Sequence, residues 1–252
     1  MSAASIAPAV QRFVGLPPIA EPLKRLRLHL PPTATVYIVG GALRNLIIDA
    51  LFGNSPATAD IDVFIGGIAK DYSFNDLLKD QACEHTELGG MRWWPSECPY
   101  AFDLCALAQF VFFEKYQLPP TLQNLLACID FNVNAVVFDT QARQLHEKGC
   151  ISAIAARCMD FNTTRMLNRL MLAYRILLIR HKTGFLLSAP VFSYVKHQID
   201  LATLKNLKGL LQKKAGKAMA KAVMADYDEI CSYKDYAAYS AAYRYASPYL
   251  DG

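Results

Sequence analysis

The sequence predicts an α+β fold, in which a short mixed sheet with flanking helices is followed by an all-helical segment. Up to about residue 150, short runs rich in β-branched and aromatic residues alternate with turn residues and helical patterns. Beyond that point, the period of the apolar residues changes from two to about 3.6. We therefore predict an N-terminal arm over residues 1–35, a mixed head over 36–150 and a helical domain over 151–252.

The composition excludes several classes of protein. The chain has 252 residues, of which 53% are hydrophobic and 19% are charged, so it can bury a substantial core and is not a disordered tail. The net charge of +4 permits an anionic partner without requiring one. The seven cysteines form no CxxC pair, which favours reduced thiols, a cytoplasmic location and no zinc site. We find no secretory signal pattern and no apolar stretch long enough to span a bilayer, so we expect no membrane partner.

Several prolines interrupt the N-terminal arm. Between them, the sequence predicts one short basic helix at roughly 21–30. Such a helix could pack on the head or contact RNA.

The head begins with a strand, a glycine turn, a helix and an acidic strand. The first strand and its turn read VYIVGG at 36–41, and the acidic strand reads ADIDVF at 59–64. Between them, a helical pattern runs over 42–52 and is closed by Gly53.

This order has a chemical meaning. Asp60 and Asp62 are two residues apart in a strand, so their side chains point to one face with Cα atoms about 6.5–7 Å apart. Two carboxylates on one face suit a Mg²⁺ ion. Gly40 and Gly41 have no Cβ, so the backbone can approach a phosphate closely, and the helix behind them directs its N–H groups and positive dipole end toward it.

These residues resemble the head of the polymerase-beta-type nucleotidyltransferases, in particular bacterial-type poly(A) polymerases and CCA-adding enzymes, whose pattern is GGxVRD followed by DxD. The matching residues are Gly40, Gly41, Arg44, Asp60 and Asp62. Asn45 stands where the family has Asp. The resemblance implies that an NMP is moved from an NTP, with ATP favoured and CTP possible, to a hydroxyl acceptor such as an RNA 3′ end. Gly40 and Gly41 would hold the triphosphate, and Arg44 would neutralise it.

A third carboxylate lies in the apolar strand at 100–107. Asp103 is isolated there, and a buried carboxylate is costly unless something compensates it. Similar enzymes take a third metal ligand from a strand beside the DxD strand, and the resemblance implies that Asp60, Asp62 and Asp103 are catalytic and bind two Mg²⁺ or Mn²⁺ ions. The alternative is an N-cap or a hydrogen-bonded core aspartate.

The segment DFNVNA at 130–135 resembles the family motif RRDFTINA. The resemblance makes Asp130 and Asn134 candidate nucleotide-binding residues. Cys128 and Ile129 replace the two arginines of the family motif, which removes positive charge expected near the nucleotide.

The helical domain offers two basic faces. A helix is predicted from Thr163 or Thr164 to residue 182, with Met166 on its apolar side. Its basic face contains Arg165, Arg169 and Arg180, with Arg175 on the flank. Arg169 and Arg175 resemble a family helix that lies beside the nucleotide. The basic face could instead be ordinary solvated surface, and Arg165 and Arg180 are candidates for nucleic-acid binding.

A second helical region is predicted over 196–225. Its apolar stripe is Leu201, Leu204, Leu207, Leu211, Ala215, Ala218 and Ala222. Lys213, Lys217 and Lys221 gather on the other side, where they could bind nucleic acid or simply face solvent.

Aromatic residues are predicted to be structural. Trp93 and Trp94 follow Gly89 and Gly90 in a predicted hairpin, and we expect both in the core rather than stacked on a base. The tyrosines between residues 227 and 249 are expected to pack between helices.

Two other functions keep the same head. The nucleotidyl group could be placed on a protein or a small molecule, or the head could be a catalytically inactive nucleic-acid-binding module. The departures at Asn45 and at 128–129 favour the inactive module, whereas the intact aspartates argue against it.

Overall fold

The computed structural model describes residues 3–86, 90–165 and 168–246. The chain divides into two compact units, residues 1–152 and 153–252, which are described separately. Gly89, Met166 and Tyr249, which figure in the sequence predictions, lie outside the described residues.

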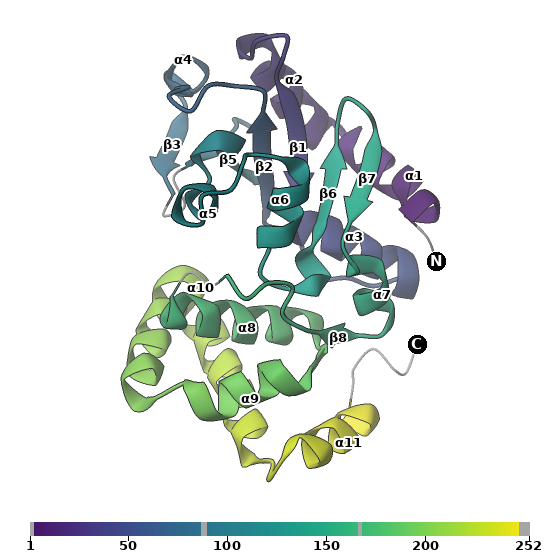
Figure 1. Cartoon of the computed structure of the whole chain (residues 1–252), viewed down its shortest axis with the longest axis vertical. Helices are drawn as coiled ribbons and strands as arrows, with labels where there is room; N and C mark the ends of the chain where they lie inside the picture. The colour runs from purple at the N-terminus through teal and green to yellow at the C-terminus, as the bar shows by residue number, and fades with distance from the viewer. Residues whose placement is uncertain (1–2, 87–89, 166–167, 247–252) are drawn as a thin grey trace. The chain divides into compact units, whose positions relative to one another are not determined.

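The first unit is built on a mixed sheet of seven strands in the order β3-β4-β5-β2-β1-β6-β7 (Figure 1). Its strands are β1 (Thr35–Val39), β2 (Asp60–Gly66), β3 (Ala82–His85), β4 (Met91–Trp94), β5 (Ala101–Ala106), β6 (Val136–Asp139) and β7 (Gln144–Glu147). Strands β2 and β5 are parallel, and the other neighbouring pairs are antiparallel. The centre of the sheet is apolar, because the inward residues of β1, β2 and β5 are fully buried.

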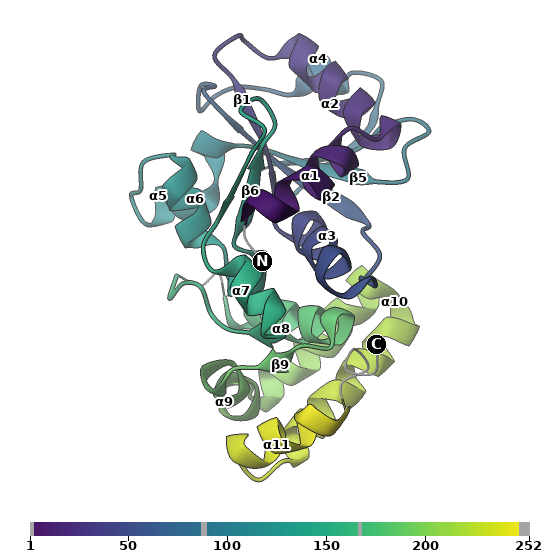
Figure 2. The same cartoon turned by 90° about the vertical axis from the view of Figure 1, so that its right-hand side faces the viewer.

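Helices cover both faces of this sheet. They are α1 (Ala3–Val14), α2 (Pro17–His29), α3 (Gly41–Phe52), α4 (Asn75–Leu78), α5 (Val111–Lys115) and α6 (Leu122–Cys128), while α7 (Cys150–Ala155) spans the boundary between the units. Figure 2 shows α5 and α6 on one face and α1 and α3 on the other. Helix α3 ends at Gly53 in the left-handed conformation, which confirms the predicted C-cap.

The helix predicted at 21–30 is present as part of α2, but the arm contains a second helix, α1, that the sequence did not predict. Pro17 and Pro18 occupy the first turn of α2, where a missing N–H costs little. Pro8 lies inside α1, but Ile6 and Val10 of that helix are fully buried. Burial of these side chains outweighs the local cost of the proline. Helix α1 packs against α3 and β7.

The predicted hairpin of β3 and β4 is present, but its two tryptophans differ. Trp93 is fully buried and packs on Phe102, which confirms its core position. Trp94 is 41% exposed, so its predicted core position is wrong. Successive side chains in a strand point to opposite faces, and only Trp93 points into the core.

The second unit is helical apart from a short parallel pair of strands. Its elements are β8 (Cys158–Met159), α8 (Arg169–Thr183), β9 (Leu186–Leu187), α9 (Ala189–Gln198), α10 (Leu201–Ser232) and α11 (Tyr236–Ala246). The predicted α+β fold class is therefore confirmed, with the pair β8 and β9 inside a segment expected to be all-helical. Tyr239 is 2% exposed and stacks on Phe192, as expected for a packing tyrosine. In the described ranges, no helix combines the length and apolarity needed to cross a bilayer.

Two helix predictions in this unit need correction. Helix α8 begins at Arg169 rather than after Thr163 or Thr164, because the Asn168 side chain caps it by accepting a hydrogen bond from the Met171 N–H at 2.7 Å. Arg165 therefore lies outside this helix, and the predicted face of three arginines is not formed.

Helix α10 is interrupted at Gly216, where φ is 85° and ψ is 162°. Since only glycine adopts this conformation readily, the kink shifts the buried face of the second half. Ala220 and Val223 are buried there, whereas Ala218, predicted in the apolar stripe, is exposed.

Candidate active site

The three predicted catalytic aspartates lie on two neighbouring strands of the first unit. Asp62 of β2 is the register partner of Asp103 of the parallel strand β5, and Asp60 is the first residue of β2. Residues paired in register on adjacent strands project from the same face of a sheet. The sheet therefore brings the three carboxylates to one edge, and the Asp60 side chain is 51% exposed there.

The glycine turn borders this carboxylate group. Gly40 follows β1 with φ of 73° and precedes α3, which begins at Gly41. A Cβ atom on Gly40 would lie 3.6 Å from the Oδ2 atom of Asp62. Gly40 therefore lies beside Asp62, at the N-terminal end of a twelve-residue helix, and its positive φ favours glycine there.

Arg92 of β4 is part of the same site, and the sequence did not assign it a role. Its register partner is Asp103. Its Nε donates to Asp103 Oδ1 at 2.7 Å and its Nη2 to Asp103 Oδ2 at 2.6 Å, while Nη2 also lies 3.4 Å from Asp60 Oδ2. The charge of Asp103 is therefore compensated by a two-point ion pair, rather than by an N-cap or a neutral core hydrogen bond.

The electrostatics follow from this pairing. The hydrogen bond to Asp103 raises the pKa of the Arg92 guanidinium, despite the opposing effect of burial. Carboxylate oxygens are suitable ligands for Mg²⁺ or Mn²⁺, so the residue types fit a metal site. In this structure the cation beside Asp103 is Arg92, and within the described part of the chain no three His, Cys, Asp or Glu side chains are already arranged to hold a metal ion.

Arg44 lies in a buried polar network rather than on the surface. It is 5% exposed and donates to Asn134 Oδ1 at 2.7 Å and to Asn45 Oδ1 at 2.9 Å. Asn45 donates onward to Thr58, and Asn134 Nδ2 lies 3.5 Å from Asp130 Oδ1. Four motif positions, Arg44, Asn45, Asp130 and Asn134, therefore meet between α3 and the short 3₁₀ helix η2 (Asn132–Asn134).

The network shows which contacts Asn45 makes at the position where the resembling family has Asp. Asn45 accepts from Arg44 through a neutral amide, so it supplies a hydrogen bond but no charge. As the network fixes α3 behind the glycine turn, its residues position the site and Arg44 does not reach solvent.

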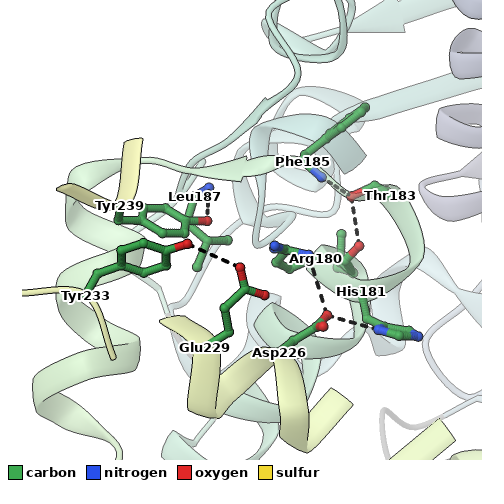
Figure 3. A network of polar contacts seen from close by, with 10 residues as sticks. Arg180, His181, Thr183, Phe185, Leu187, Asp226, Glu229, Tyr233 and Tyr239 are labelled. Carbon is green, nitrogen blue, oxygen red and sulfur yellow. Dashed lines mark hydrogen bonds and ion pairs between the residues drawn. The ribbon is translucent and has the colours of Figure 1, made fainter. Parts of the chain in front are cut away.

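The predicted basic residues of the second unit occupy different environments. Arg180 is mostly buried. Figure 3 shows its side chain directed toward Asp226. Its Nη1 lies 3.5 Å from Asp226 Oδ2, and His181 Nδ1 lies 2.9 Å from the same oxygen. Its guanidinium also lies over the Tyr243 ring at 5.7 Å. Arg180 therefore holds α8 against α10.

The remaining candidates lie nearer to solvent. Arg169 is exposed, whereas Arg165 and Arg175 are partly buried. Lys213, Lys217 and Lys221 are all exposed, but the kink at Gly216 separates Lys213 from the other two.

Comparison with solved structures shows what this fold is similar to. A CCA-adding enzyme in complex with ATP aligns with a TM-score of 0.58 and 16% identity, over 88% of this chain and 54% of that one. A CCA-adding enzyme in complex with CTP aligns with a TM-score of 0.55 and 17% identity, over 91% and 55%. The Thermotoga maritima CCA-adding enzyme complexed with tRNA aligns with a TM-score of 0.54 and 18% identity, over 90% and 54%.

These identities establish a likeness of fold. No protein-family model matches the sequence, and no curated protein matches it. The chain spans about half the length of the enzymes it resembles. Its fold is similar to that of these CCA-adding enzymes, in agreement with the resemblance seen at the GG and DxD residues.

Proposed function

We propose that this chain is a metal-dependent nucleotidyltransferase that moves an NMP from an NTP to an RNA 3′ hydroxyl, with release of pyrophosphate. The observation that carries the proposal is the pairing of Asp62 with Asp103 on adjacent parallel strands, beside the glycine turn at Gly40. The fold shared with CCA-adding enzymes supports it, since their structures contain ATP, CTP or tRNA. ATP is the favoured donor, and CTP is the second candidate.

Each part of the site then has a role. Asp60, Asp62 and Asp103 would hold two Mg²⁺ or Mn²⁺ ions, which when bound supply charge stabilisation to the attacking and leaving oxygens. Gly40 and the first turn of α3 would receive the triphosphate through backbone N–H groups. The network of Arg44 would keep this turn in place, so that binding energy is used for positioning.

A second candidate function is a nucleic-acid-binding module without catalysis. Two observations favour it: Arg92 contacts both oxygens of Asp103, and the side chain of Arg44 is only 5% exposed. In that case the head would act as a scaffold.

Label transfer tests the proposal directly. The protein is incubated with Mg²⁺ or Mn²⁺, each α-labelled NTP in turn, and either short RNAs or a cell extract. We expect label on RNA 3′ ends with the wild type and none with Asp103→Asn. Label on a protein or a small molecule would show that the acceptor is not RNA. An absence of transfer with every NTP would contradict the proposal and favour the non-catalytic nucleic-acid-binding module.

A further inference from the structure

The pairing of Arg92 with Asp103 has a direct consequence for metal binding. The two guanidinium nitrogens contact the two oxygens of Asp103 at 2.7 and 2.6 Å, and one of them also approaches Asp60 at 3.4 Å. A divalent ion needs lone pairs on these same oxygens. Arg92 and a metal ion therefore compete for Asp103.

The sheet offers Arg92 a second partner. In register, Glu84 of β3 pairs with Arg92 of β4, which pairs with Asp103 of β5. Side chains directly opposite each other on adjacent strands share a face, with Cβ atoms about 4.5–5.5 Å apart. Arg92 thus lies between the positions of two carboxylates on one face, so rotation about its side-chain bonds would direct it from Asp103 toward Glu84.

The environment allows this exchange. The side chains of Arg92 and Asp103 are 34% and 21% exposed, so water screens the pair. The backbone of β4 and β5 is fixed by the ladder on both sides of β5, so that the side chain can move without a change of fold.

We propose that Arg92 is a built-in counter-cation that closes the acidic site to metal, and that metal binding transfers the guanidinium from Asp103 to Glu84. This inference rests on the proposed function, because it concerns how the same aspartates acquire their ions. It makes Arg92 a regulatory residue: the site stays neutralised until metal, alone or with NTP, displaces the internal cation.

Mn²⁺ affinity in the absence of nucleotide tests the exchange. Free Mn²⁺ is measured by electron paramagnetic resonance during titration of the full chain. We expect Arg92→Gln to tighten Mn²⁺ binding by about 10-fold, because the ion then no longer competes with a guanidinium for the oxygens of Asp103. A change of about 10-fold is the lower end of the effect that outer-shell partners have on metal affinity. Glu84→Gln should weaken binding, since the displaced guanidinium loses its second partner.

The exposed pair of Lys70 and Glu114 provides charge-matched controls. These side chains lie 3.4 Å apart in the same unit and are 65% and 74% exposed. Lys70 follows the end of β2 opposite to Asp60. Lys70→Gln and Glu114→Gln change the net charge as the two test variants do, and we expect their Mn²⁺ affinities to stay close to wild type.

Arg92→Lys keeps the charge but loses the two-point fork, so it should fall between wild type and Arg92→Gln. It also provides a test if Arg92→Gln folds poorly, which circular dichroism would reveal. Unchanged Mn²⁺ affinity in both Arg92 variants would overturn the inference, and so would an absence of binding in all variants.

The measurement separates this inference from the proposed function. Label transfer by the wild type together with unchanged Mn²⁺ affinity in the Arg92 variants would remove the inference and keep the function. Tighter Mn²⁺ binding in Arg92→Gln without transfer from any NTP would keep the inference and remove the function.

Discussion

Two Arg–Asp pairs in this chain share their chemistry and differ in their surroundings. Arg92 and Asp103 lie at the edge of the sheet in the first unit, with Asp60 half exposed beside them. Arg180 and Asp226 join α8 to α10 in the second unit, with side chains only 13% and 20% exposed and Tyr243 against the guanidinium. The two aspartates are about equally exposed, at 21% and 20%. The pairs differ at the arginines, since Arg92 is 34% and Arg180 13% exposed, and in the two further carboxylates near Arg92.

The two pairs also differ in how their charges are balanced. Asp226 contacts Arg180 and His181, so its negative charge is compensated by side chains of the same unit. Around Arg92, one guanidinium faces the three carboxylates Asp60, Asp62 and Asp103, all of which interact with it. An acidic excess of this kind is unfavourable for folding and is resolved by a bound cation. We therefore expect the first pair to control activity and the second to control stability.

The largest expected effect concerns activity. Asp60→Asn should reduce nucleotidyl transfer by at least about 100-fold, because even changes around a metal ligand cost about 10–100-fold. The free energy of unfolding should stay within about 0.5 kcal/mol of wild type, since the side chain is half exposed. Label transfer and urea unfolding measure the two quantities.

Asp49→Asn is the matched control, as Asp49 is an exposed aspartate near the end of α3. It should leave transfer unchanged. Full transfer activity in Asp60→Asn would contradict the expectation that the carboxylates around Arg92 control activity.

The second pair should show the opposite behaviour. Asp226→Ala leaves the enclosed Arg180 guanidinium without its carboxylate, which should lower the free energy of unfolding by about 3 kcal/mol. Asp228→Ala, an exposed change on the same helix, should cost no more than about 0.5 kcal/mol. Urea unfolding of both variants provides the test, and equal stability of the two would contradict a structural role for Asp226.

The sequence predicted much of the framework for local reasons. The glycine turn, the Gly53 cap and the strand with Asp60 and Asp62 each leave a short-range pattern, and all are present. Arg92 could not be identified in this way, since its role depends on β4 lying beside β5 in a particular register. The useful signal was a single arginine in a hairpin next to a strand with a single aspartate.

The helical unit was harder to predict because capping and packing override periodicity. The helical wheel placed Arg165, Arg169 and Arg180 on one face, but Asn168 starts α8 after Arg165 and Asp226 draws Arg180 inward. In α10, the non-helical backbone at Gly216 interrupts the helical periodicity on which the predicted faces were based. In each case one residue changes the face that its neighbours present.

The next largest effect concerns the pKa of the Cys105 thiol, which the charge of Asp62 influences. Burial, reinforced by the negative charge of Asp62, raises the pKa of the Cys105 thiol from 9.0 to about 12. Above pH about 9 the unfolded chain releases this proton first, so stability should fall as pH rises, by up to about 1.4 kcal/mol per pH unit. Cys105→Ala should make this loss shallower in urea unfolding between pH 9 and 11.

Asp62→Asn should have a smaller effect in the same direction, because it removes only the charge contribution. Cys83→Ala, at an exposed thiol in the same unit, is the control. An identical pH dependence of stability in wild type and Cys105→Ala would show that folding does not raise the pKa of this thiol.

The smallest expected effect concerns the lysines of α10. They differ from both Arg–Asp pairs because they are exposed and could act only through a partner. Lys217 and Lys221 are four residues apart after the kink at Gly216, so they share a face, whereas Lys213 lies before it. If both contact RNA phosphates, Lys217→Gln with Lys221→Gln should make the slope of log K against log salt shallower by about 1.4, at about 0.7 per contact on a single strand.

Filter binding or fluorescence anisotropy with a short RNA at several salt concentrations measures this slope. Lys213→Gln should change it by no more than about 0.7. Lys70→Gln with Lys79→Gln removes the same charge from exposed positions of the first unit and should leave the slope unchanged. An equal slope in wild type and in the α10 double variant would mean that these lysines only face solvent, because phosphate contacts cannot be lost without a loss of counterion release.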